Sequence, residues 1–264
     1  MRSGSNIQVP SKEEKKRIAS VLKVIKKLED FIDESEFIPA TDDYRGTIIL
    51  GLLSKCLTVG RAVCALAQAG FPEEAYGLTR TLIDIYLTVR YISNKNTEIR
   101  AQRFAEFFMK NHESWAVIIP KFYPQASIAD TREHRLFLET AKKYKNPHDW
   151  SGEPLKTKSL ALEPDTYEFD ATGKGTTAEF DYEIMFKWTS HFVHSTVSAL
   201  ESHLVERGDT FKIRGRWGMR RGRSHSPFNV LAFVSKTFIC GFRALRQDQP
   251  EKILQQMHRL MQTY

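Results

Sequence analysis

Cysteine is scarce in this chain of 264 residues, which has 3 cysteines at widely separated positions. A disulfide framework or a zinc motif requires cysteines, or cysteines with histidines, at short and regular spacings. Cys56, Cys64 and Cys240 instead lie inside apolar helical patterns, which is typical of reduced thiols in a protein core. The sequence therefore excludes a disulfide framework and a cysteine-based zinc motif, and it predicts a cytoplasmic protein.

Long hydrophobic runs, internal repeats and alternating strand patterns are also missing. Without about 18 consecutive apolar residues the sequence predicts no transmembrane helix and no membrane partner, and its first residues lack the apolar centre of a signal peptide. Hydrophobic residues make up 41% and charged residues 27%, as in an ordinary soluble globular protein. The segment GKGTT at 173–177 lacks the earlier glycine of a phosphate-binding loop, so no cofactor is expected.

Acidic residues are absent from the most basic stretch of the chain, FKIRGRWGMRRGRSH at 211–225. The formal net charge is +7, and part of this excess is local to the stretch. A basic chain suits an acidic partner such as RNA, and an arm with glycines and aromatics could hold phosphates. The alternative is a solvated basic surface hairpin; either way we expect a small β-hairpin near 210–222. The candidate phosphate-binding residues are Arg214, Arg216, Arg220, Arg221 and Arg223.

Helical periodicity dominates the rest of the chain. After a flexible tail at 1–10, Ser11 and Glu14 form a capping box that opens an amphipathic helix ending near Ser35. Two apolar helices follow, joined by a turn in which Gly70 suits a left-handed helix end and Pro72 a first helical turn. The predicted helices are 11–35, 44–69, 73–94, 96–118, 130–145, 180–205, 227–244 and 249–262, with an irregular insert at 146–178.

These elements predict the all-α fold class, as a helical bundle with a long irregular insert. We expect a single domain over 11–264, with its core at 40–205 and C-terminal helices at 227–264. A helical surface of this kind could also form a homodimer.

Two histidines, His191 and His194, stand three residues apart in the apolar helix at 180–205. Lys187 and Ser195 share their polar stripe at helical spacing. Bulky aromatic residues flank this narrow stripe, so we expect it to face a cleft rather than open water. Histidine titrates near neutral pH, which suits it to proton transfer.

Charged residues interrupt the two earlier apolar helices in a similar way. Arg80 and Asp84 lie one turn apart, where Asp84 could orient an imidazole and Arg80 could hold an anion through two hydrogen bonds. If these residues meet the histidine stripe, together they form an acid–base site around a phosphate or carboxylate. The candidate catalytic residues are His194, Arg80, Asp84 and His191, and the candidate binding residues include Lys55, Lys187 and Ser195.

Each of these residues also has a structural alternative. Arg80 and Asp84 could be an ion pair that ties helix ends together. His191 could contact only water, and His194 could be a core histidine bonded to a backbone carbonyl. A metal site is a further alternative, because histidines at i and i+3 can share one ion, with Asp84 as a third ligand.

Two segments resemble a bacterial family, domain of unknown function 5677, over about 40–205. The first, GFPEEAYGLTRTLID at 70–84, has a glycine–aromatic turn and ends in an arginine and an acid four residues later. The acid here is Asp84, where the family leads us to expect glutamate. The second segment, SHFVHST at 190–196, has a valine–histidine step between small polar residues. The resemblance implies an all-α fold and brings no established activity.

A looser similarity is to HEPN proteins, helical bundles that are often RNA-cutting toxins or defence factors. Their ribonuclease signature is an arginine and a histidine separated by a short spacer. The frame that ends at His194 has Lys187 in place of the arginine, whereas Arg220 and His225 fit the spacing within the basic stretch. The similarity implies a histidine acting on the RNA 2′-hydroxyl, with a cation steadying the phosphate.

The leading hypothesis is therefore a HEPN-like protein that acts on RNA or nucleotides in defence or as a toxin. One alternative is a non-catalytic binding or dimerisation module that recognises a small anion or a protein partner. Another is a metal-dependent hydrolase that uses His191, His194 and Asp84.

Overall fold

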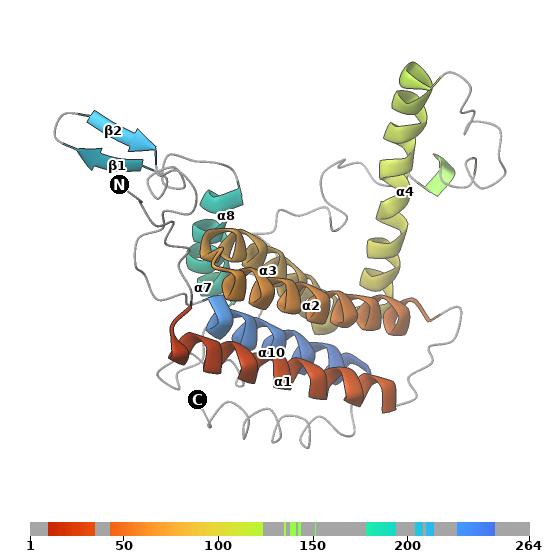
Figure 1. Ribbon diagram of the computed structural model, residues 1–264. Helices are drawn as coiled ribbons and strands as arrows, with labels where there is room; N and C mark the ends of the chain where they lie inside the picture. Colours follow the sequence, from red (N-terminus) through yellow and green to blue (C-terminus); the bar gives the residue numbers. More distant parts are fainter. Residues whose placement is uncertain are drawn as a thin grey trace.

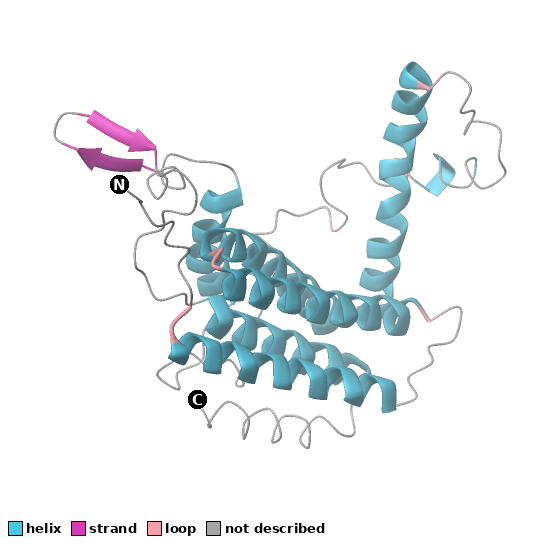
Figure 2. Ribbon diagram, in the orientation of Figure 1, coloured by secondary structure: helices cyan, strands magenta, loops and turns pink. Residues whose placement is uncertain are grey.

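A computed structural model describes residues 10–34, 43–123, 178–193, 204–207, 210–213 and 226–245, with 135, 138–140, 142–143 and 151 as isolated positions. This part of the chain is almost entirely helical, as Figure 2 shows. The expected all-α fold class is thus confirmed. The irregular insert at 146–178 and the last helix at 249–262 lie outside the described residues, apart from Ser151 and Ala178.

The first two helices begin at side-chain caps. Helix α1 (Lys12–Glu34) starts at the predicted capping box, in which the Glu14 backbone N–H donates to the Ser11 hydroxyl over 3.1 Å. At α2 (Tyr44–Ala69), the Asp43 carboxylate accepts a 2.7 Å hydrogen bond from the Gly46 backbone N–H. These local interactions explain why the sequence alone located both helix starts.

Gly70 and Pro72 form the predicted turn between α2 and α3 (Pro72–Asn94). Gly70 has a φ of 87°, a left-handed conformation that glycine adopts without a Cβ clash. Pro72 occupies the first turn of α3, where its missing N–H costs no helical hydrogen bond. Helix α4 (Thr97–Phe122) follows and runs four residues beyond the predicted end at 118.

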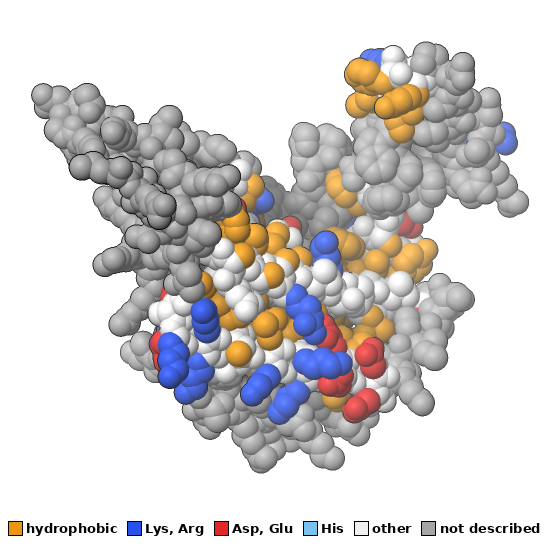
Figure 3. Space-filling view, viewed as in Figure 1, with side chains coloured by type: hydrophobic (Ala, Val, Ile, Leu, Met, Phe, Trp, Pro, Cys, Tyr) orange, Lys and Arg blue, Asp and Glu red, His pale blue; other side chains and the backbone are white. Residues whose placement is uncertain are grey.

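Four helices pack side by side: α1, α2, α3 and α10 (Ser226–Leu245). Figure 1 shows them as two layers, with α2 and α3 above α1 and α10, while α4 rises away from this bundle. Lysine and arginine side chains gather over α1 in Figure 3, on the face that points away from the core. The fully buried side chains inside the bundle include Ile25, Leu53, Val63, Tyr86 and Phe238.

Two glycines allow α2 to approach its neighbours closely. A Cβ on Gly60 would lie 3.3 Å from the Ile25 side chain of α1 and 3.2 Å from the Val230 side chain of α10. A Cβ on Gly241 of α10 would lie 2.9 Å from Leu53 of α2. The three helices therefore meet where glycine leaves room for a neighbouring aliphatic side chain.

By length and composition alone, α2 could cross a membrane, since its most apolar window has a mean hydropathy of 1.7. A core helix of a folded protein passes the same test. Helix α2 contacts α1, α3, α4 and α10, which together account for its apolar sequence. The absence of a membrane partner remains a prediction.

The segment predicted as one α-helix at 180–205 has a different course. It begins with α7 (Ala178–Phe180), continues as a π-helix, η1 (Asp181–Phe186), and then as α8 (Lys187–Val193). The prediction is wrong at its end, because strand β1 (Leu204–Arg207) pairs with β2 (Thr210–Ile213). In this antiparallel pair Leu204 lies opposite Ile213. The hairpin thus begins earlier than the predicted 210–222, because cross-strand pairing outweighs the helical pattern that runs into Leu204.

Candidate functional site

Arg80 of α3 and Ser190 of α8 bring together the two segments that the sequence singled out. The Arg80 Nε donates a 2.9 Å hydrogen bond to the Ser190 hydroxyl. That hydroxyl in turn donates to the Phe186 backbone carbonyl over 2.7 Å. The Arg80 guanidinium also lies over the Phe186 ring, 4.6 Å from its centroid. A hydrogen bond and a cation–π contact thus hold this guanidinium in one orientation.

Arg80 is half-buried, and its two terminal nitrogens form no hydrogen bond or ion pair with any residue that the structure describes. A guanidinium partly removed from water is stabilised by an anion, which it binds most strongly through two parallel N–H donors. The geometry therefore suits a phosphate or carboxylate oxygen pair.

Asp84 is not the partner of Arg80. It is exposed one turn further along α3, and its interactions lie elsewhere. Among the described residues, the Arg80 Nε bonds to Ser190, and Arg80 forms no ion pair with Asp84. Asp84 nevertheless remains on the same helix as Arg80, one turn away.

Lys187 and His191 are exposed on α8, on either side of the Arg80 contact in sequence. Lys187 forms an ion pair with Glu183 of η1, and its Nζ lies 5.7 Å from the centroid of the Tyr182 ring. The hydrogen bond to Glu183 raises the pKa of Lys187 above its ordinary value. Lys187 is thus already matched by a carboxylate, which weakens its case as the main phosphate ligand.

Lys55 is exposed on α2 and forms no hydrogen bond or ion pair with Arg80, Lys187 or His191. His194 and Ser195 lie outside the described residues, as do the five arginines of the basic stretch, so their roles remain predictions. Within the described part of the chain, no three histidine, cysteine, aspartate or glutamate side chains gather as a metal site.

A buried ion pair next to this site was missed by the sequence reasoning. The Lys236 Nζ of α10 lies 2.7 Å from the Asp181 carboxylate of η1, and their side chains are 9% and 3% exposed. The same ammonium lies 5.5 Å from the centroid of the Tyr86 ring and 5.4 Å from that of Phe233. Lys236 in the middle of the mostly apolar helix at 227–244 was the signal that could have revealed it.

The pair lies where the chain enters the π-helix, which packs on α3. Asp181 is the first residue of η1, and the rings of Tyr182 and Phe186 stack 5.3 Å apart along it. A π-helix inserts a residue into the helical repeat and so turns the following side chains to a new direction. Phe186 and Ser190, which hold Arg80, lie at the end of η1 and just after it.

One family of proteins matches this chain. It is described as a family of unknown function (DUF5677), and its match covers residues 46–211, which include Arg80, η1 and α8. Neither a curated protein nor a solved structure matches the chain.

Proposed function

The chain belongs to the DUF5677 family of unknown function, and we propose that it binds RNA or nucleotide phosphate at the contact between α3 and α8. The observation that supports this proposal is the Arg80 guanidinium, which Ser190 and Phe186 orient while its terminal nitrogens have no acceptor among the described residues. Arginine in a fixed orientation is the usual ligand of phosphate.

The charge of the chain favours nucleic acid over a carboxylate ligand. The formal net charge is +7, and six cations stand without an acid between Phe211 and His225. Such a stretch attracts the phosphates of RNA whatever the base sequence is. Arg80 would then hold one phosphate at a defined place, while the arginines from Arg214 to Arg223 supply affinity.

The reaction that we propose for this site is metal-independent RNA cleavage of the HEPN kind. His194 would act as a general acid or base in the reaction of the RNA 2′-hydroxyl. Arg80 would stabilise the charge that develops on the phosphate. His191 is exposed one position after Ser190 and would serve as the second proton-transfer group. Asp84 would orient an imidazole. In a bacterial cell, such cleavage would act as a toxin or an antiphage defence.

The binding part is tested with fluorescently labelled RNA, titrated at low salt against wild type, Arg80→Ala and Arg103→Ala. Arg103 is an exposed arginine of α4 without a described partner, so its variant loses the same charge away from the site. We expect Arg80→Ala to weaken binding roughly 10- to 100-fold, because it removes charge-assisted hydrogen bonds, and Arg103→Ala to change it little. Equal affinities for the two variants, or no RNA binding, would contradict the proposal.

The catalytic part is tested by incubating RNA with wild type, Arg80→Ala and His194→Ala in the presence of a chelator. If the wild type cleaves RNA and both substitutions abolish the cleavage, the roles assigned to Arg80 and His194 are supported. If neither substitution changes the cleavage, these roles are wrong. Binding without cleavage would favour the non-catalytic anion-binding module. Elemental analysis of the purified protein tests the metal-dependent hydrolase directly.

A further inference from the structure

Trp188 of α8 is a large aromatic side chain on the protein surface, with 47% of it exposed. Its ring lies edge-on to Tyr76 of α3, with the centroids 5.0 Å apart and the planes at 72°. The two rings thus meet edge to face and do not stack in parallel. Exposing so much of a tryptophan sacrifices apolar burial, and such residues are frequent in binding surfaces.

The place of Trp188 relates it to the phosphate site. Tyr76, which supports Trp188, lies one helical turn before Arg80 on α3, and side chains at this spacing are neighbours about 5–6 Å apart. Arg80 in turn contacts Phe186 and Ser190, which belong to the same η1–α8 segment as Trp188. An exposed aromatic ring and an oriented arginine are therefore parts of the same α3–α8 surface.

An exposed aromatic ring together with an oriented arginine is a combination that binds single-stranded nucleic acids. A base of a single strand can leave its neighbours and stack on an aromatic ring, while a nearby cation holds its phosphate. In an RNA duplex the bases are stacked within the helix, and such a ring cannot reach their faces. Charge also favours a nucleic acid over an apolar protein partner here, because the Arg80 guanidinium lies against the same α8 segment.

We propose that Trp188 is a base-stacking subsite, so that the α3–α8 surface selects single-stranded RNA over duplex RNA. This proposal rests on the RNA binding proposed above and adds a residue and a substrate form to it. One base stacks on the exposed part of the indole, and the phosphate of the same or the adjoining nucleotide binds the terminal nitrogens of Arg80.

The test uses a short single-stranded RNA, the duplex of the same sequence, and a strand in which abasic sugars replace the nucleotides. Binding is measured for wild type, Trp188→Ala, Trp188→Phe and Phe122→Ala. Phe122 is the matched control, since it is an aromatic residue that is 75% exposed on the end of α4. Trp188→Phe keeps a stacking ring, and far-ultraviolet circular dichroism checks that each variant is folded.

We expect Trp188→Ala to weaken single-strand binding roughly tenfold, the usual effect of removing one stacked base, with Trp188→Phe close to wild type. Duplex and abasic binding should hardly change in any of the three variants. Tryptophan fluorescence should be quenched by single-stranded RNA in wild type and less in Trp188→Phe.

The outcomes separate the two proposals. If Arg80→Ala weakens RNA binding while Trp188→Ala does not, the base-stacking subsite is wrong and the phosphate site stands. If Arg80→Ala has no effect, or no RNA binds, the proposed function fails and this inference with it. A change of oligomeric state in Trp188→Ala without a change in RNA affinity would also overturn it, because Trp188 would then contact a protein.

Discussion

The Nε of Arg80 on α3 donates a hydrogen bond to the hydroxyl of Ser190 on α8, across 110 positions of sequence. This contact joins the two segments that carry the candidate catalytic residues. The Ser190 hydroxyl also donates a hydrogen bond to the Phe186 backbone carbonyl, so it is both acceptor and donor. The orientation of Arg80 therefore depends on a residue that itself need not touch any ligand.

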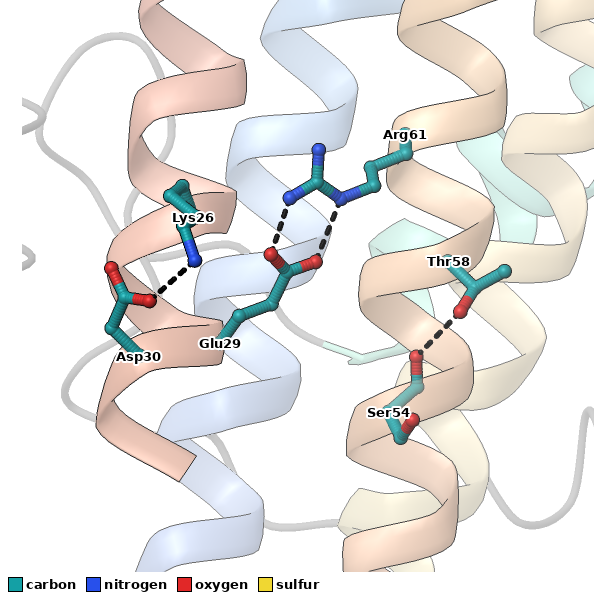
Figure 4. A network of polar contacts seen from close by, with 6 residues as sticks. All are labelled: Lys26, Glu29, Asp30, Ser54, Thr58 and Arg61. Carbon is teal, nitrogen blue, oxygen red and sulfur yellow. Dashed lines mark hydrogen bonds and ion pairs between the residues drawn. The ribbon is translucent and has the colours of Figure 1, made fainter. Parts of the chain in front are cut away.

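Replacing Ser190 with alanine tests that dependence. Because Arg80 loses an orienting acceptor but keeps its charge, we expect RNA affinity to fall several-fold, with a loss of roughly 0.5–1.5 kcal/mol in unfolding free energy. Thr58→Ala is the control, since the Thr58 hydroxyl donates over 3.1 Å to the Ser54 carbonyl within α2 (Figure 4). Binding titrations and urea denaturation measure the two effects. A fall in affinity of equal size in Thr58→Ala would refute the orienting role.

The buried pair of Asp181 and Lys236 should be costly to break by removing one partner alone. Replacing Lys236 by methionine leaves the Asp181 carboxylate buried without its cation, so we expect a loss of about 3–5 kcal/mol in urea denaturation. The double variant Asp181→Leu with Lys236→Met removes both charges and should be clearly more stable than the two single losses predict. Strict additivity of the two substitutions would show that the ion pair has little energetic weight.

Gly241, which lies at the contact between α10 and α2, and Gly51, which lies on an open side of α2, predict opposite effects of substitution by alanine. Gly241→Ala places a Cβ 2.9 Å from a methyl group of the fully buried Leu53 and 3.2 Å from Ile49, so we expect a loss of about 1–3 kcal/mol. Gly51→Ala meets no atom within 4 Å and should gain roughly 0.5–1 kcal/mol, since alanine favours the helix. Thermal and urea unfolding of both variants provide the comparison. Stabilisation by Gly241→Ala would mean that α2 and α10 are less tightly packed.

The ion pair between Glu29 of α1 and Arg61 of α2 predicts a pH dependence (Figure 4). The hydrogen bond from Arg61 lowers the pKa of Glu29 below its ordinary value of 4.5. Since the pKa is lower in the folded state, the pair adds stability above about pH 4.5 and loses it as the pH falls through the lowered pKa.

We therefore expect Glu29→Gln to lose stability at pH 7 and to match wild type near pH 2. The loss should stay within about 1 kcal/mol, because both side chains remain partly exposed to solvent. Urea denaturation across this pH range measures it. A difference that persists in strong acid would assign the effect to packing rather than to charge.

Two of the three cysteines should be unreactive while the protein is folded. Burial raises the pKa of the Cys56 thiol to about 12, and burial likewise raises that of Cys64 to about 12. The thiolate is the reactive form, so in a Cys240→Ala variant we expect no labelling by a thiol reagent at pH 8 until a denaturant is added. Rapid labelling of one equivalent in the native variant would show that α2 is less buried than the structure has it.

Local interactions made the first three helices predictable. The Ser11–Glu14 capping box and the Gly70–Pro72 turn involve residues at most three positions apart, so their sequence signals are complete in themselves. The π-helix is different, because no local pattern distinguishes Asp181–Phe186 from an ordinary α-helix. Its first residue is held by Lys236, 55 positions away.

The sequence by itself therefore determined the helical class, the ends of the early helices and the residue types of the candidate site, since each follows from neighbours along the chain. Only the tertiary structure decided that Arg80 bonds to Ser190 and not to Asp84, and that Lys236 neutralises Asp181 inside the core. The physical reason is that a charged side chain can bind any of several partners on other helices. The packing of whole helices decides which of these partners comes within reach.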